Sequence, residues 1–242
     1  MEISIILSLA FLIIASIYDL KSREVPKKIW VFFIPVSIVT TIAQLIANPN
    51  QIYITLASIT LTTLIAFAVF YTGLYGGADA KGLITLSLAH PTQSQNKSLI
   101  LPTLPLSAFN NSLLLMVVTL PLSLIRNIYW KIKNNQPLFK GLEREPIWKK
   151  VAALIFCIKT PKSKIKPYHI LTERIEIKDG KPKRILKIFQ KVKEENTMID
   201  DTVPDDAFIA FSLPMLPFLT LGYLVAVTLG DLILHLTFVI LH

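Results

Sequence analysis

The 242-residue chain is poor in the residues that build cross-linked, metal-binding and phosphate-binding sites: it has one cysteine, four histidines and eight glycines. A single cysteine, Cys157, excludes a scaffold held by intrachain disulfides. We find no Cys/His cluster with metal-ligand spacing, no glycine loop of the phosphate-cradling type and no serine nucleophile elbow. Chemistry that depends on bound zinc, on a nucleotide phosphate or on an activated serine therefore lacks its residues, and we expect no metal and no cofactor.

Charged residues are also scarce, and they are unevenly distributed. They make up 17% of the chain against about 25% in a typical soluble domain, while apolar residues make up 52%. Residues 131–206 hold 18 of the 25 Lys and Arg and 11 of the 16 Asp and Glu. This distribution excludes a soluble globule and indicates a membrane protein with one charged, water-exposed segment.

Outside residues 131–206, the chain contains long apolar runs. A helix that crosses the hydrocarbon core needs about 20 mainly apolar residues. Five runs fit this requirement, although the first only just, namely 3–18, 29–47, 52–75, 106–125 and 207–230. Residues 82–90 form a shorter apolar run, and 232–241 are apolar after Asp231. We therefore predict an all-α polytopic membrane protein of about six transmembrane helices, with 82–90 as a short fourth span or half-span.

The basic residues predict the orientation, because Lys and Arg accumulate in cytoplasmic loops. The first loop, 19–28, carries four of them, whereas the second loop, 47–51, has no charge. The N-terminus lacks the basic region of a cleaved signal peptide, so we interpret the first run as a retained helix. This places the N-terminus outside the cell membrane and residues 131–206 in the cytoplasm. The predicted domains are 1–130, 131–206 and 207–242.

The charged segment has fold signals of its own. Residues 168–177 and 184–191 alternate in part between apolar and polar, and Asp179-Gly180 between them is a strong hairpin signal. Residues 146–158 predict a short helix with partly buried side chains, namely Trp148, Val151, Ile155 and Cys157. We expect a small α+β cytoplasmic insert that contains a β-hairpin. Its net charge of about +7 favours contact with anionic lipid headgroups over nucleic acid, because the strands lack exposed aromatic residues.

Ionisable residues in or beside spans are costly, which makes each of them a functional candidate: Asp19, Asp79, Lys81, His90, Asp231 and His235. Asp19 ends the first span, and Asp79 follows the third in Gly76-Gly77-Ala78-Asp79. A span that runs from outside to inside ends at each of them. Both carboxyl groups are therefore expected at the cytoplasmic membrane face and at similar depth.

Two adjacent carboxyl groups in a low-dielectric site do not easily both ionise, so they share a proton. The ionised partner can then take a proton from water while the protonated partner polarises a peptide carbonyl. Small residues such as Gly76, Gly77 and Ala78 let a substrate strand approach the site. The pair is thus suited to amide hydrolysis without a metal or a covalent intermediate.

Purely structural roles are open for the same residues. Asp19 can terminate a helix at the interface, and Asp79 can cap the helix that follows the glycine pair. Lys81 can extend toward the membrane surface. His90 and His235 fit packing or interface positions, and Asp231 fits a charge at the outer end of the last span. Cys157 fits a structural thiol in a reducing compartment.

The stretches Asp19-Leu-Lys-Ser-Arg-Glu-Val-Pro26 and Gly76-Gly77-Ala78-Asp79-Ala80-Lys81 resemble motifs of the type IV prepilin peptidases. These are GxGD intramembrane aspartyl proteases, and the similarity is greatest to their archaeal branch, the preflagellin peptidases. Ala78 replaces the glycine that directly precedes the second aspartate in the strict motif. The resemblance implies that Asp19 and Asp79 are catalytic, with Gly76, Gly77, Ala78 and Lys81 supporting the site.

The resemblance also implies the substrate. Such enzymes cleave class III signal peptides, which have a short basic leader before an apolar helix, from archaellin- and pilin-like precursors. Glu24 or acidic residues of the insert are candidates for contact with the basic leader. Bacterial members that also methylate their product carry paired CxxC motifs, which are missing here, so no methyltransferase activity is expected.

Two other functions are compatible with the same carboxylates. A signal-peptide-peptidase or presenilin-like protease also uses two membrane aspartates, but we find no Pro-Ala-Leu motif near the C-terminus. A proton-coupled transporter can use carboxylates as a relay. Transporters place such groups near the midplane between internal repeats, whereas here they are predicted at one face and no repeat is visible.

Overall fold

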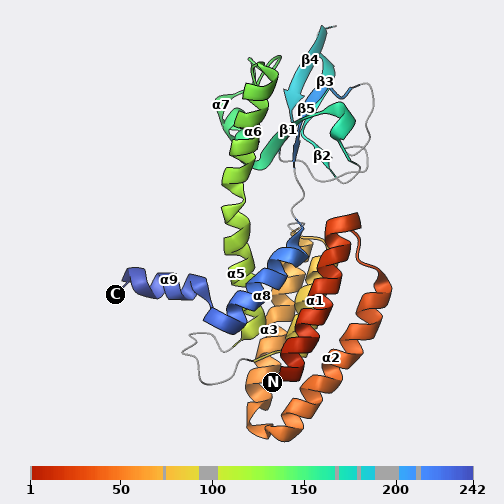
Figure 1. The fold of residues 1–242 in the computed structure, drawn as a ribbon, viewed down its shortest axis with the longest axis vertical. Coiled ribbons are helices and arrows are strands. Elements are labelled where there is room, and N and C mark those ends of the chain that lie inside the picture. The colour runs from red at the N-terminus through yellow and green to blue at the C-terminus, as the bar shows by residue number, and fades with distance from the viewer. Residues whose placement is uncertain are drawn as a thin grey trace. The chain divides into compact units, whose positions relative to one another are not determined.

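The computed structural model describes residues 2–72, 75–92, 103–166, 169–178, 181–188, 202–210 and 214–241. Residue contacts divide the chain into two compact units. One, here called the helical unit, comprises Met1–Met116 and Pro214–His242, and the other, the insert unit, comprises Val117–Leu213. The fold is mostly helical with a small β-region, as predicted (Figure 1). The unit boundaries differ from the predicted boundaries at 130 and 206.

The described part of the helical unit is built from helices. Helix α1 packs against α2, and α8 packs along α1 (Figure 1). The short helix α4 packs against both α2 and α3. The elements are α1 (Glu2–Ser22), α2 (Lys27–Ala47), η1 (Pro49–Gln51), α3 (Ile52–Tyr71), α4 (Gly77–Ala89), α5 (Leu104–Val118), α8 (Met215–Leu229) and α9 (Leu232–Leu241).

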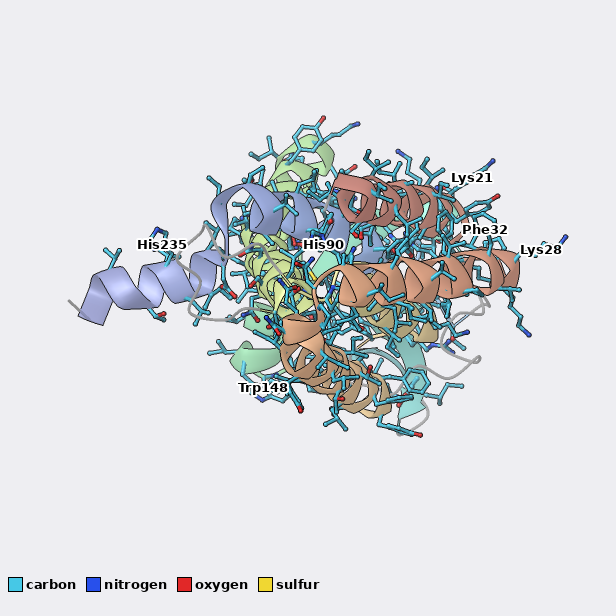
Figure 2. The ribbon with its side chains drawn as sticks, turned by 90° about the horizontal axis from the view of Figure 1, so that it is seen from below. Lys21, Lys28, Phe32, His90, Trp148 and His235 are labelled. Atoms are coloured by element: carbon cyan, nitrogen blue, oxygen red, sulfur yellow. The ribbon has the colours of Figure 1, made fainter. Side chains whose placement is uncertain are left out.

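Helix α3 of this unit buries small residues and exposes large apolar ones. The buried face of α3 consists of Thr55, Ser58, Thr62 and Ala66, which recur at helical spacing. Large apolar side chains on the same helix, such as Leu64 and Phe67, are exposed, and Phe32 on α2 likewise points outward (Figure 2). Small residues at the contacts and apolar residues outside are typical of helices packed in lipid. The helical unit is therefore built as a multi-pass membrane protein.

Among the described residues, four helical segments are long and apolar enough to cross a membrane: Ile3–Ser22, Lys27–Ala47, Pro49–Tyr71 and Leu104–Asn134. Helices α4 and α8 are shorter, with 13 and 15 residues. The predicted last span, 207–230, is wrong at its start, because Asp206–Ala210 forms strand β5 and α8 begins at Met215. The cause is that Ala207, Phe208 and Ile209 are all buried in a central strand, which gives the same unbroken apolar run as a membrane helix.

Tight contacts hold α8 in the helical unit. The core of this unit includes Phe11 and Leu12 of α1 together with Leu216, Leu219 and Tyr223 of α8. On the other side of α8, a Cβ atom added at Gly222 would lie 2.3 Å from the backbone oxygen of Ala108 on α5. No residue larger than glycine fits at this crossing without moving a helix.

The insert unit combines two helices with two small sheets. Its helices are α6 (Leu120–Asn134) and α7 (Ile147–Phe156), which pack together, and a short turn η2 covers Lys162–Lys164. One sheet has the strand order β1-β5-β2, with β5 antiparallel to both neighbours. The strands are β1 (Cys157–Pro161), β2 (Ile170–Leu171), β3 (Glu173–Lys178), β4 (Lys181–Leu186) and β5.

The predicted hairpin is confirmed: β3 and β4 pair antiparallel with Lys178 opposite Lys181. The turn residues Asp179 and Gly180 lie outside the described residues. The predicted helix is also present as α7, directly after Pro146, but Trp148 and Val151 are 58% and 48% exposed rather than partly buried. Sequence reasoning missed the three-stranded sheet, since its strands come from distant parts of the insert.

A buried ionic network links the two sheets. Glu173 Oε2 lies 2.8 Å from Lys159 Nζ, and Glu173 Oε1 lies 2.6 Å from Arg184 Nε. Asp206 is 3.3 Å from each of the same two cations. The backbone N–H of Phe208 also donates to Glu173 Oε2 at 2.9 Å. The side chains of Lys159 and Glu173 are fully buried, so each charge depends on the others for its stabilisation.

Candidate active site

Asp19 lies near the C-terminal end of α1 and is only 7% exposed. Its Oδ2 accepts a hydrogen bond of 3.3 Å from the backbone N–H of Leu216, in the first turn of α8. One turn earlier on α1, Ser16 Oγ is 2.7 Å from Thr220 Oγ1 of α8. The N-terminal turn of a helix carries unpaired N–H groups and a partial positive charge, so it stabilises the carboxylate of Asp19 there.

Asp79 is the third residue of α4. Its Oδ2 accepts a hydrogen bond of 2.9 Å from the N–H of Gly76, while its own N–H donates to the Gly76 oxygen at 3.1 Å. The carboxylate thus closes the first turn of α4, which is close to the capping role expected for it. It also lines a small cavity with Tyr75, Phe109 and Met215. The cavity volume of 10 Å³ is about the least that holds one water molecule.

The structure brings these two carboxylates together. They are near enough to repel each other electrostatically, although 60 residues of chain separate them. Both are attracted by the same cation, Arg23. The meeting point is formed by the end of α1 and the beginnings of α4 and α8. Two neighbouring carboxyl groups, of which Asp79 lines a water-sized cavity, form an arrangement that can activate water against a peptide carbonyl.

Arg23 was not among the residues predicted for the site. Its N–H donates to the Asp19 backbone oxygen at 3.2 Å, and its φ of +60° lies in the left-handed region that few residues other than glycine adopt. This conformation ends α1 and turns the arginine back toward the carboxylates. The sequence shows Arg23 only as one of several basic residues in a loop, because a left-handed arginine has no local sequence signal.

The predicted supporting residues surround Asp79 in different ways. Gly76 precedes α4 and Gly77 opens it, and both are exposed. Ala78 packs against the core of the helical unit, whereas Lys81 is exposed. A Cβ atom at Gly77 would meet nothing nearer than Phe70 at 3.6 Å, an ordinary contact. The backbone beside Asp79 is therefore open to a partner on the Gly76-Gly77 side.

The remaining ionisable candidates have structural surroundings. His90 is buried at the end of α4 with Nδ1 2.8 Å from the Tyr223 hydroxyl, while His235 is exposed on α9 (Figure 2). Asp231 is more than the predicted boundary charge: it is buried, it caps α9 through the N–H groups of Ile233 and Leu234, and it accepts from Asn110 Nδ2 at 2.8 Å. None of the three contacts the Asp19–Asp79 region in these interactions.

Cys157 is a free, fully buried thiol in β1. Burial raises its pKa to about 11, so the thiol stays protonated and unreactive at neutral pH. This agrees with the predicted structural role. Within the described part of the chain, no cluster of three or more His, Cys, Asp or Glu side chains is arranged to hold a metal ion.

Comparison with known proteins agrees with this geometry. The sequence profile of the type IV leader peptidase family matches residues 6–120, a range that contains both Asp19 and Asp79. This part of the chain is therefore similar to the type IV leader peptidase family, as the resemblance predicted. Over 238 residues the chain is also 27% identical to the preflagellin peptidase of Methanococcus voltae, and the match covers 93% of this chain and 94% of that protein.

Proposed function

We propose that the chain is an aspartic endopeptidase of the cell membrane that removes leader peptides from preflagellin- and pilin-like precursors. The observation that carries the proposal is the convergence of Asp19 and Asp79, from helices far apart in sequence, where Asp79 also lines a small cavity. The family match and the similarity to a preflagellin peptidase support the same activity.

In the proposed mechanism, one carboxylate of the pair takes a proton from water and the other, protonated, donates to the scissile carbonyl. The N–H of Leu216 holds Asp19 and the N–H of Gly76 holds Asp79, which positions both side chains. Lys81, exposed two residues after Asp79, and the open Gly76-Gly77 backbone form the approach for an extended substrate strand.

The proposed topology has six spans, with the N-terminus outside and residues 131–206 in the cytoplasm. The basic loop after α1 and the basic insert support this orientation. A basic leader is then retained in the cytoplasm while the apolar helix of the precursor lies in the bilayer. The peptide bond between them is presented at the depth of Asp19 and Asp79. Glu24, exposed just after α1, is a candidate contact for the leader.

The decisive experiment is cleavage of a precursor with a Lys-Gly leader junction by purified enzyme in lipid. We expect Asp19→Asn and Asp79→Asn each to lower the cleavage rate by about 10³-fold, because each removes a general acid or base. The product should be the unmethylated mature segment, which mass spectrometry identifies. Full activity in either variant would overturn the proposal.

A matched control is Asp231→Asn, the same change at a third acidic residue of the helical unit. Asparagine is as good a helix cap as aspartate, so this variant should fold and cleave at close to the wild-type rate. Loss of activity in all three variants would point to a general effect on folding instead of a catalytic pair.

Arg23 provides a second test of the same site. If its charge positions the two carboxylates, Arg23→Gln should lower kcat by about tenfold, since a charge-assisted interaction is worth roughly 1.5–3 kcal/mol. Arg23→Lys should restore most of the rate, and the melting temperature should be similar in both variants. Equal activity of the Gln and Lys variants would show that the charge of Arg23 has no part in positioning the pair.

A further inference from the structure

The insert unit contains an open pocket of 960 Å³ between α6, β1 and η2. Its wall is rich in cations and contains two aromatic residues of α6, Tyr129 and Trp130. The basic residues that line it are Arg126, Lys133, Lys140, Lys159, Lys162, Lys164 and Arg184. The acidic residues of the lining are Asp205 and Asp206.

The acidic residues do not neutralise this pocket. Asp206 and the nearby Glu173 are already engaged by Lys159 and Arg184 in the buried ionic network. Among the described residues, Arg126, Lys140 and Lys164 form no side-chain ion pair, and Lys133 lies 5.9 Å from the Tyr129 ring centroid. An excess of positive charge therefore faces an open volume, and an anion is the complementary ligand.

Helix α6 connects this pocket to a membrane-like surface. Arg126, Tyr129, Trp130 and Lys133 line the pocket at intervals of three and four residues, so they share one face of the helix. A different face carries exposed apolar side chains, namely Ile125, Ile128 and Ile132, which are 59%, 46% and 74% exposed. The same helix is the end of the apolar segment Leu104–Asn134, which is long enough to span a membrane.

Exposed apolar side chains are also present on α7. Ile147 and Trp148 are 78% and 58% exposed there, and α7 packs directly against α6. Exposed isoleucine and tryptophan beside lysines are typical of segments that lie in the interface between lipid tails and headgroups. The anion nearest to such a segment is the phosphate of a lipid headgroup.

We propose that this pocket binds the phosphate-bearing headgroup of an anionic phospholipid, with Arg126, Lys133 and Lys164 contacting the phosphate and α6 lying against the acyl chains. The volume accepts a headgroup, and the open side of the pocket leaves a path for the chains. The proposal rests on the placement of the insert unit at the membrane surface and not on the peptidase chemistry of Asp19 and Asp79.

The test is lipid binding to the full-length protein in detergent, measured by native mass spectrometry with phosphatidylglycerol and with phosphatidylcholine of identical chains. We expect preferential binding of one phosphatidylglycerol. Arg126→Gln/Lys133→Gln should weaken it by about tenfold or more, because each basic residue near an anionic lipid surface contributes roughly 1 kcal/mol. The matched control Lys131→Gln/Arg144→Gln removes one lysine and one arginine outside the pocket and should bind like the wild type.

Three outcomes would overturn the lipid site. Equal loss in the control variant would mean diffuse attraction instead of a pocket. Equal binding of both lipids would mean that the site does not distinguish an anionic headgroup from a zwitterionic one. If a modest excess of inorganic phosphate displaces phosphatidylglycerol, and if phosphate alone occupies the pocket to the same extent, the pocket would be assigned to a soluble phosphate compound. Cleavage of precursor in neutral lipid should stay at the wild-type rate in the pocket variant, which separates this test from that of the active site.

Discussion

The two units of the molecule stabilise buried acidic groups in different ways. In the insert unit, Glu173 is fully buried between Lys159 and Arg184, so its charge is balanced by cations. In the helical unit, Asp19, Asp79 and Asp231 are each held by backbone N–H groups at the beginning of a helix, α8, α4 and α9 respectively. The insert unit uses opposite charges, and the helical unit uses helix termini.

This difference has a chemical consequence. Both carboxylate oxygens of Glu173 are engaged, Oε2 by Lys159 and the N–H of Phe208 and Oε1 by Arg184. A carboxylate held by one N–H group keeps its other oxygen and its lone pairs available. The helical unit thus contains acids that can do chemistry, whereas the acids of the insert unit maintain its fold.

The largest expected effect on stability comes from breaking the ionic network. Glu173→Ala leaves Lys159 buried without its main partner and also removes the acceptor of the Phe208 N–H. We expect a loss of about 3–5 kcal/mol in the unfolding free energy of the insert unit. Pulse proteolysis of the full chain in urea measures this loss, because the amount of fragments from residues 117–213 reports the unfolded fraction of the insert unit.

The control for this change is Glu176→Ala, which removes an ion pair with Lys187 whose two side chains are 35% and 40% exposed. Its cost should be below about 1 kcal/mol, as for other partly exposed pairs. Equal costs for the two variants would mean that burial does not distinguish the network from a surface pair.

A smaller effect is expected in the helical unit. Asp231→Ala removes the cap of α9 and one hydrogen bond to Asn110, at a cost of about 1–2 kcal/mol. Asp231→Asn should cost only a fraction of this, because its side-chain oxygen can still accept from the helix. Thermal unfolding in detergent compares the two. A large loss in the Asn variant would show that the negative charge is needed, which would weaken the contrast between the units.

Much of the helical unit could be predicted from the sequence, because hydropathy runs and basic loops are local signals. The proximity of Asp19 and Asp79 is expected from counting helices, which predicts a similar depth for both. The hairpin β3–β4 follows from Asp179-Gly180 and the alternation on either side. In each case the pattern and the structure depend on residues close together in the chain.

The features that could not be predicted depend on distant residues. The partner of Asp19 is a backbone N–H 197 residues away, and the N–H groups of a helix have no sequence signature. Strand β5 has the composition of a membrane segment because it is buried on both faces. The close approach at Gly222 is known only once α5 and α8 are placed side by side.

The two polar links between α1 and α8 have a consequence for biosynthesis. The side chains of Ser16 and Asp19 emerge from the ribosome with the first turns of the nascent protein, yet their partners Thr220 and Leu216 follow 204 and 197 positions later. During translation the first aspartate has no helix terminus to hold it. The proposed active site therefore gains these two contacts only after α8 has been synthesised, so a nascent chain that lacks α8 holds Asp19 differently from the complete protein.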